Sequence, residues 1–225
     1  MTKLSRENNF SYLFFALITM LFSTALLGTL QQEWIRTILD VTTFGLFVVG
    51  TYSVRTERSW LWAFIAMSLV LIVFTILHAL LPKTIATALH LSIILFFFIG
   101  GFLLSYKQIL LVRNVNQNVM LGSIVLYLLL GLIWTIIYLL ILLAFPDAFN
   151  GLEAIAWQEN FSRVVYYSFV TLTTLGYGDI SPKNGIAEFF VYLQTIFGVF
   201  YMAIIVSTLV SSRLAQLQKE PPSDV

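Results

Sequence analysis

The sequence contains no cysteine and very little charge. Without cysteine among its 225 residues, disulfide bonds, thiol nucleophiles and cysteine metal sites are excluded. Charged residues make up 10% of the chain, whereas a typical soluble domain carries about 25%. The formal net charge is only +1, so there is no basic face for nucleic acid. These absences argue against a soluble domain and against a nucleic-acid partner.

What the sequence has instead is long apolar runs, with 59% hydrophobic residues overall. A helix that crosses a membrane needs about 20 apolar residues. Six runs are candidates for such helices: 10–30, 37–54, 60–81, 85–106, 119–145 and 187–212. The first run is too long for the apolar part of a signal peptide and is expected to be an uncleaved spanning helix. The predicted fold class is an all-α integral membrane protein with six transmembrane helices.

Lysine and arginine predict the orientation, because they are enriched on the cytoplasmic side of membrane proteins. With both termini inside, eight basic residues are cytoplasmic: Lys3, Arg6, Arg55, Arg58, Lys107, Arg113, Arg213 and Lys219. Four then lie outside: Arg36, Lys83, Arg163 and Lys183. We therefore expect a multi-pass protein of the cell (plasma) membrane with cytoplasmic N- and C-termini. Compact loops and absent cysteine indicate a bacterial source.

A polar stretch, "TLTTLGYGDI" at 171–180, interrupts the region between the last two runs. The preceding residues 162–173 are apolar and aromatic but too short to span, which predicts a re-entrant pore helix with Ser162 as its N-cap. Non-helical backbone at membrane depth is tolerated only inside protein or beside a watery cavity. Gly176 and Gly178 can adopt positive φ, and alternating unusual conformations would turn successive carbonyls to one side. Such a row of carbonyls can coordinate a dehydrated cation.

Residues 171–179, Thr-Leu-Thr-Thr-Leu-Gly-Tyr-Gly-Asp, resemble the T-x-x-T-x-G-Y-G-D signature of the tetrameric potassium channels. The resemblance implies a selectivity filter whose carbonyls and threonine hydroxyl replace the hydration shell of K⁺. It also implies a homotetramer, since each chain carries a single copy of the segment. The implied filter residues are Thr174, Leu175, Gly176, Tyr177 and Gly178.

The segment departs from the family pattern at two positions. Leu175 stands where the family more often has valine or isoleucine, and Val170 replaces a glutamate that braces the aspartate in some two-span channels. An aromatic pair precedes the filter, and the Tyr167 hydroxyl is a candidate partner of Asp179; the alternative is that both tyrosines only pack. The residues expected to support the filter are Asp179, Tyr166, Tyr167 and Thr173.

The last apolar run carries a candidate gate. Gly198 lies twenty residues after Gly178 and matches the family's hinge glycine, although a close-packing glycine is the alternative. Steps of four residues place Met202, Val206 and Val210 on one helical face with Gly198. All three are apolar, so a constriction there would gate by dewetting.

The chain divides into four parts by these features. Residues 1–106 form a four-helix domain that resembles a voltage sensor, but the run 85–106 contains no arginine or lysine. Gating by voltage needs several such charges, so we expect a voltage-independent channel in which these helices form a collar or bind a regulator. The remaining parts are a cytoplasmic linker at 107–118, a pore domain at 119–212 and a short cytoplasmic tail at 213–225.

Three functions were compared on the sequence. The favoured one is a potassium channel with K⁺ as the permeant ion, no cofactor, and three further copies, membrane lipids and an unidentified regulator as partners. The alternatives are a poorly selective cation channel and a non-conducting channel-like subunit. An enzyme is not expected, because no metal cluster, nucleophile–base pair or phosphate loop stands out.

Asn160-Phe161-Ser162 fits a glycosylation pattern but is interpreted as part of a helix cap.

Overall fold

The computed structural model describes residues 9–27, 45, 82–110, 117–153, 155–207, 210, 211 and 214. Most of these residues are helical, as predicted; the rest form loops and one small sheet that was not predicted. The helices are α1 Asn9–Leu27, α4 Lys83–Leu110, α5 Gln117–Ala144, α6 Trp157–Leu172 and α7 Gly185–Phe200, and α7 continues as a π-helical segment, η2 Tyr201–Val206. The predicted runs 37–54 and 60–81 lie outside the described residues except for Gly45, so six spans stay a prediction.

Among the described residues, three helices are long and apolar enough to cross a membrane. They are Lys83–Ile109, Gln117–Ala144 and Gly185–Ile204, and Phe10–Leu26 is apolar but shorter. These segments coincide with four of the six predicted runs. Their length and composition support a membrane protein.

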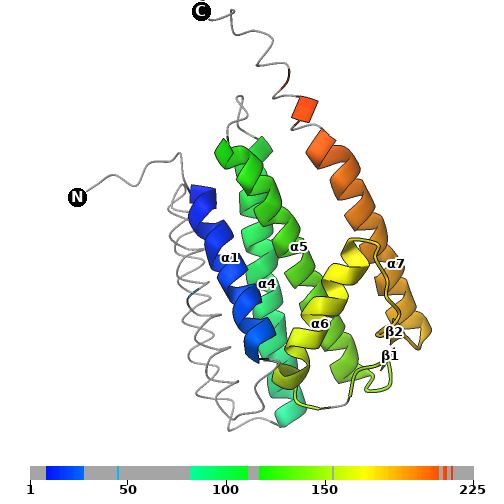
Figure 1. The fold of residues 1–225 in the computed structure, drawn as a ribbon. Coiled ribbons are helices and arrows are strands. Elements are labelled where there is room, and N and C mark those ends of the chain that lie inside the picture. Colours follow the sequence, from blue (N-terminus) through cyan, green and yellow to red (C-terminus); the bar gives the residue numbers. More distant parts are fainter. Residues whose placement is uncertain are drawn as a thin grey trace, which may run out of the picture.

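Helix α5 is the centre of the packing. It contacts α1, α4 and α6 along its length, and α1, α4 and α5 run side by side in Figure 1. Its fully buried side chains include Leu126, Leu132, Ile136, Tyr138 and Leu139. A helix that is apolar on all sides is expected in such a covered position.

Helix α6 is short and inclined. Its 16 residues correspond to about 24 Å at 1.5 Å per residue, less than the ~30 Å hydrocarbon core of a bilayer. Figure 1 shows α6 between α5 and α7, ending part-way along them, after which the chain returns to the end where α6 began. The path is that of the predicted re-entrant helix.

A two-stranded antiparallel sheet fixes the loops at that end. Strand β1 (Phe149–Asn150) precedes α6, and strand β2 (Ser181–Pro182) follows the polar stretch. The backbone N–H of Lys183 donates to the Ala148 carbonyl at 2.7 Å. Gly151, at φ +78°, lies so close to the Asp179 carbonyl that a Cβ would be 2.3 Å from its oxygen. The loop before α6 is therefore attached to the chain that follows the polar stretch.

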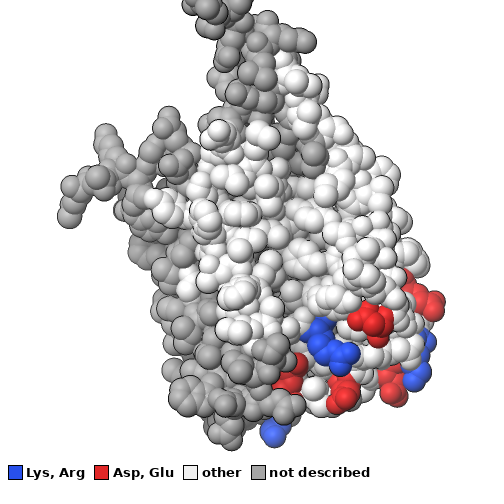
Figure 2. All heavy atoms as spheres, viewed as in Figure 1, with Lys and Arg blue, Asp and Glu red and all other residues white. Residues whose placement is uncertain are grey.

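The charged side chains visible in Figure 2 gather at this same end of the molecule, around the loops and the start of α6. The described surface above them in that view is uncharged. An uncharged surface with charged residues gathered at its end is expected for helices surrounded by lipid.

Candidate functional site

Helix α6 begins earlier than predicted. Its first residue is Trp157, and the N-cap is Ala156 rather than Ser162, which lies inside the helix. The prediction of Ser162 as the cap was wrong. The Ala156 carbonyl accepts from the N–H groups of Glu159 and Asn160 at 3.0 and 3.4 Å, so the first turn closes without a capping side chain.

Asn160 holds this first turn to the preceding loop. Its side chain is 1% exposed, and Nδ2 donates to the Glu153 carbonyl at 2.7 Å. Because the amide nitrogen is buried and used in this bond, it is not accessible for glycosylation. Asn160 therefore has a structural role, which accounts for the glycosylation pattern without glycosylation. It lies within the first turn of α6 and does not cap the helix as predicted.

The C-terminal end of α6 leads directly into the polar stretch. The Thr173 hydroxyl donates to the Phe169 carbonyl at 2.8 Å, and the Thr174 N–H donates to the Thr171 carbonyl at 2.9 Å. The N–H groups of Leu175 and Gly176 both turn back to the Val170 carbonyl, at 2.9 and 3.4 Å. The first amides of the stretch are therefore anchored on the C-terminal end of α6.

The backbone of the stretch alternates in conformation. Gly176 has φ +55° and Gly178 has φ +82°, which confirms the prediction of positive φ at both glycines. Thr174 also has positive φ, at +61°, while Leu175 and Tyr177 do not. Positive φ at a β-branched residue is strained, and such strain persists where the surrounding structure imposes it, often at functional sites. Sequence reasoning did not predict it for Thr174.

The side chains from Thr173 to Asp179 are exposed in the single chain, whereas Thr171, Leu172 and Ile180 at the two ends of the stretch are buried. Leu175 is 56% exposed and Tyr177 is 67% exposed, although both are large and apolar. Within the described part of the chain, these two side chains stay largely uncovered.

Residues 122–212 match the family model described as Ion channel. The match covers α5 from Gly122 onward, α6, the polar stretch, α7 and η2. It supports an ion channel function, and because an ion channel family is not an enzyme family, the prediction that the chain is not an enzyme is confirmed. No curated protein and no solved structure matches the chain.

Within this ion channel domain, Tyr166 and Tyr167 have different surroundings. Tyr166 is 40% exposed, and its hydroxyl interacts with the Asp179 carboxylate. Tyr167 faces the core, with its ring centroid 5.2 Å from that of Tyr138 and 5.6 Å from that of Phe149. Among the described residues, the buried Tyr167 hydroxyl has no well-formed hydrogen bond, although the Thr171 side chain interacts with it. The proposed contact between Tyr167 and Asp179 was wrong, since adjacent helical residues point to different sides.

Gly198 is where α7, which with η2 is the predicted inner helix of the pore, touches the end of α6. A Cβ at this position would lie 2.2 Å from the Leu172 carbonyl oxygen, so the close-packing alternative is confirmed. The Leu172 carbonyl also accepts from the Tyr127 hydroxyl at 3.3 Å. A hinge at Gly198 stays a prediction.

The inner helix changes geometry just after Gly198. From Tyr201 to Val206 it is π-helical, with bonds from i to i+5, and the buried Tyr201 hydroxyl donates to the Ser123 carbonyl. The α-helical register that placed Met202 and Val206 on one face with Val210 does not hold across this segment. Met202 and Val210 are 50% and 47% exposed in the single chain, and their pore-lining role stays a prediction.

Sequence reasoning missed one polar cluster in the ion channel domain. Gln194 is fully buried in α7 and bonds to Ser168 of α6 and Tyr138 of α5. The available signal was the glutamine itself, since a polar side chain inside an apolar membrane run is costly unless it has a partner.

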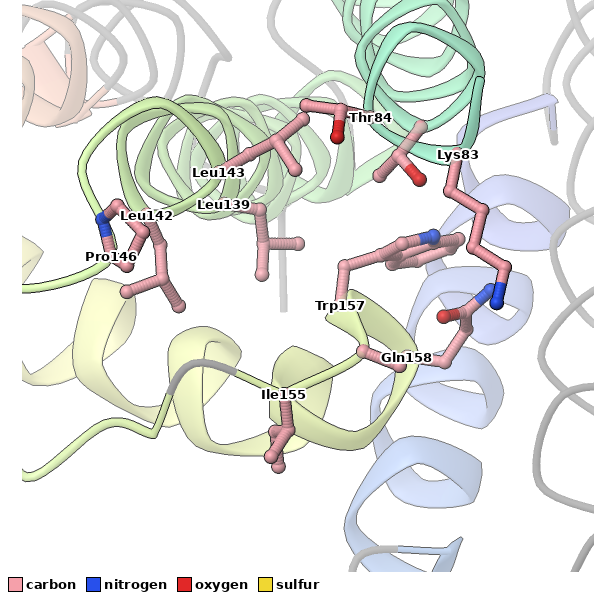
Figure 3. Close-up of a pocket in the computed structure, with 11 residues that line it drawn as sticks. Lys83, Thr84, Leu139, Leu142, Leu143, Pro146, Ile155, Trp157 and Gln158 are labelled. Atoms are coloured by element: carbon pink, nitrogen blue, oxygen red, sulfur yellow. The ribbon is translucent and has the colours of Figure 1, made fainter. Parts of the chain in front are cut away.

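A cavity of about 370 Å³ adjoins the start of α6 (Figure 3). Leu139, Leu142 and Leu143 of α5 form one wall, and Lys83 with Thr84 of α4 and Trp157 with Gln158 of α6 surround the rest. The cavity lies between the helix predicted to belong to the collar and the ion channel domain.

Proposed function

We propose that this ion channel is selective for potassium and passes K⁺ down its electrochemical gradient through a pore built by four copies of the chain. The observation on which the proposal depends most is the alternating backbone of residues 174–178. Positive φ at every second residue, with the intervening N–H of Leu175 directed to Val170, supports a strand whose carbonyls can face one axis. Rings of such carbonyls select K⁺ by replacing its water shell.

The exposed filter side chains support the tetramer. Leu175 and Tyr177 are apolar and more than half exposed in one chain, and neighbouring copies around a fourfold axis would cover them. A single filter strand cannot encircle an ion, so the site is incomplete without the other copies. In the proposed assembly α5 and α7 surround the pore, and lipids surround the collar.

The arrangement of the helix ends supports the proposed orientation. The Phe10 N–H at the start of α1 donates to Asn118 Oδ1 at the start of α5, so both helices begin at one end. In Figure 1 the inner helix ends at that same end, opposite the β1–β2 sheet. This agrees with cytoplasmic N- and C-termini in the plasma membrane and with an outward-facing filter.

Ion flux from liposomes distinguishes the proposed function from its alternatives. Purified protein is reconstituted into vesicles loaded with K⁺ in an external Na⁺ solution, and loss of K⁺ and entry of Na⁺ are recorded separately. Selective K⁺ loss is expected. Equal movement of both ions would favour a poorly selective cation channel, and no movement of either would favour a non-conducting subunit.

A further inference from the structure

The buried amide of Gln194 connects three helices behind the proposed filter. Its Nε2 donates to the Ser168 carbonyl at 2.9 Å and meets Ser168 Oγ at 3.0 Å. Its Oε1 accepts from the Tyr138 hydroxyl. Because the Ser168 carbonyl can only accept, the amide orientation is fixed by its partners.

The same network continues to the backbone of α5. Ser168 Oγ donates to the Gly131 carbonyl at 2.7 Å, and Gln194, Ser168 and Gly131 therefore tie α7, α6 and α5 together. The side chains of Gln194 and Ser168 are both 0% exposed. Directional bonds of this kind fix one arrangement of helices, where apolar packing alone tolerates small rotations and shifts.

The network lies close to the proposed filter along α6. Ser168 is two residues before Val170, whose carbonyl accepts the N–H groups of Leu175 and Gly176. A rotation or sliding of α6 at Ser168 would therefore move the anchor of the filter amides and with it the spacing of the carbonyls. The next residue on α7, Thr195, has a different role, since its hydroxyl donates to Val191 of its own helix at 3.0 Å.

We propose that Gln194 is a positioning residue for ion selectivity: its bonds to Ser168 and Tyr138 hold α6 at the depth and rotation that set the filter's carbonyl spacing. This inference rests on the proposed potassium selectivity. It assigns to Gln194 no contact with the ion.

The test compares variants of the full-length reconstituted protein by the ratio of K⁺ to Na⁺ permeability. Gln194→Met keeps the volume and removes every bond of the amide, and we expect the ratio to fall about tenfold. Thr195→Val is the matched control and should keep the wild-type ratio. In Gln194→Glu, the protonated carboxyl retains one donor and one acceptor, so selectivity should approach wild type at pH 5 and decline as the group ionises.

Smaller changes keep the test decisive if Gln194→Met does not assemble. Tyr138→Phe removes a single hydroxyl and Ser168→Ala a single Oγ, and each should lower the ratio about twofold. Their combined effect should be less than the product, as expected for members of one network. An assembled Gln194→Met with the wild-type ratio, or wild-type ratios in both smaller variants, would overturn the inference, as would an equal loss in Thr195→Val. Absence of selectivity in the wild type would instead reject the proposed function.

Discussion

At the scale of single residues, the site depends on backbone conformations that most amino acids avoid. Gly176 and Gly178 tolerate positive φ because they lack a Cβ. Thr174 adopts it at a cost. That cost is consistent with the proposed role of Thr174, in which its carbonyl and hydroxyl face the ion.

Replacing Gly176 by alanine tests this conformation directly. A Cβ at Gly176 meets no other described atom of its own chain within 4 Å, so within the chain the substitution acts through φ. Forcing an alanine to φ +55° costs about 1–2 kcal/mol, in each of four copies. We expect Gly176→Ala to form the same oligomer as wild type but to lose selective K⁺ conduction in single-channel recordings. Retention of both conductance and selectivity would show that this conformation is not required.

At this scale, a feature could be predicted from the sequence where a single physical property of a residue type determines its conformation. The two glycines were predicted because few other residues adopt positive φ. Thr174 was missed because nothing local in the sequence forces a threonine into that conformation. The candidate partner of Asp179 was Tyr167 instead of Tyr166, since the rotation of α6 depends on its packing against α5. The partners of Gln194 were missed because they come from two other helices.

At the scale of elements, the end of α6 is held by contacts with α7 and α5. Gly198 packs against the Leu172 carbonyl, and Tyr127 binds the same carbonyl from α5. Beyond this point the Tyr201 hydroxyl ties the inner helix to α5. The π-helical segment begins at this same residue, Tyr201. The departure from α geometry therefore starts where the inner helix is bonded to α5.

Substitutions of two glycines distinguish the effect of close packing on stability from the effect of helix propensity. Gly198→Ala would place a methyl group 2.2 Å from a backbone oxygen, and overpacking of this kind costs about 1–3 kcal/mol. We expect lower thermal stability of the purified oligomer and weaker K⁺ conduction. Gly101→Ala in α4 is the control, because a Cβ there meets nothing within 4 Å, and it should match the wild type. Equal stability of the two variants would contradict the close contact at Gly198.

Element boundaries were predictable where composition alone sets them. The apolar runs 85–106 and 119–145 correspond to α4 and α5 within a few residues. The start of α6 was missed by five residues because Asn160 and Ser162 are usual capping residues, yet the buried bond from Asn160 to Glu153 lets the helix begin earlier. The π-helical segment contains no proline or glycine, and its departure from α geometry accompanies tertiary contacts such as that of Tyr201.

At the scale of the whole molecule, the proposed pore requires four chains. Mass measurement of the protein in mild detergent should give about 102 kDa of protein, four times the 25.6 kDa of one chain. We expect the exposed Leu175 and Tyr177 to become protected in this species. A monomer that still conducts selectively would contradict the proposed geometry.

The collar should contribute little voltage dependence. Moving one charge through the membrane is worth about 2.3 kcal/mol per 100 mV, and steep sensors move three or four charges per subunit. The run 85–106 has no arginine or lysine, and the lysines of α4, Lys83 and Lys107, lie near its ends. Open probability should therefore vary weakly between about −100 and +100 mV on this scale. A steep conductance–voltage relation would show that other charges move.

The central claim, that residues 174–178 select K⁺, is tested most directly by the reversal potential of purified protein in a planar bilayer. With K⁺ on one side and Na⁺ on the other, the current should reverse near the K⁺ equilibrium potential, and exchange of Na⁺ for K⁺ should move the reversal to zero. The Gly176→Ala variant, measured under the same ion gradient, serves as the comparison. A wild-type current that reverses near zero in the K⁺/Na⁺ gradient would contradict potassium selectivity.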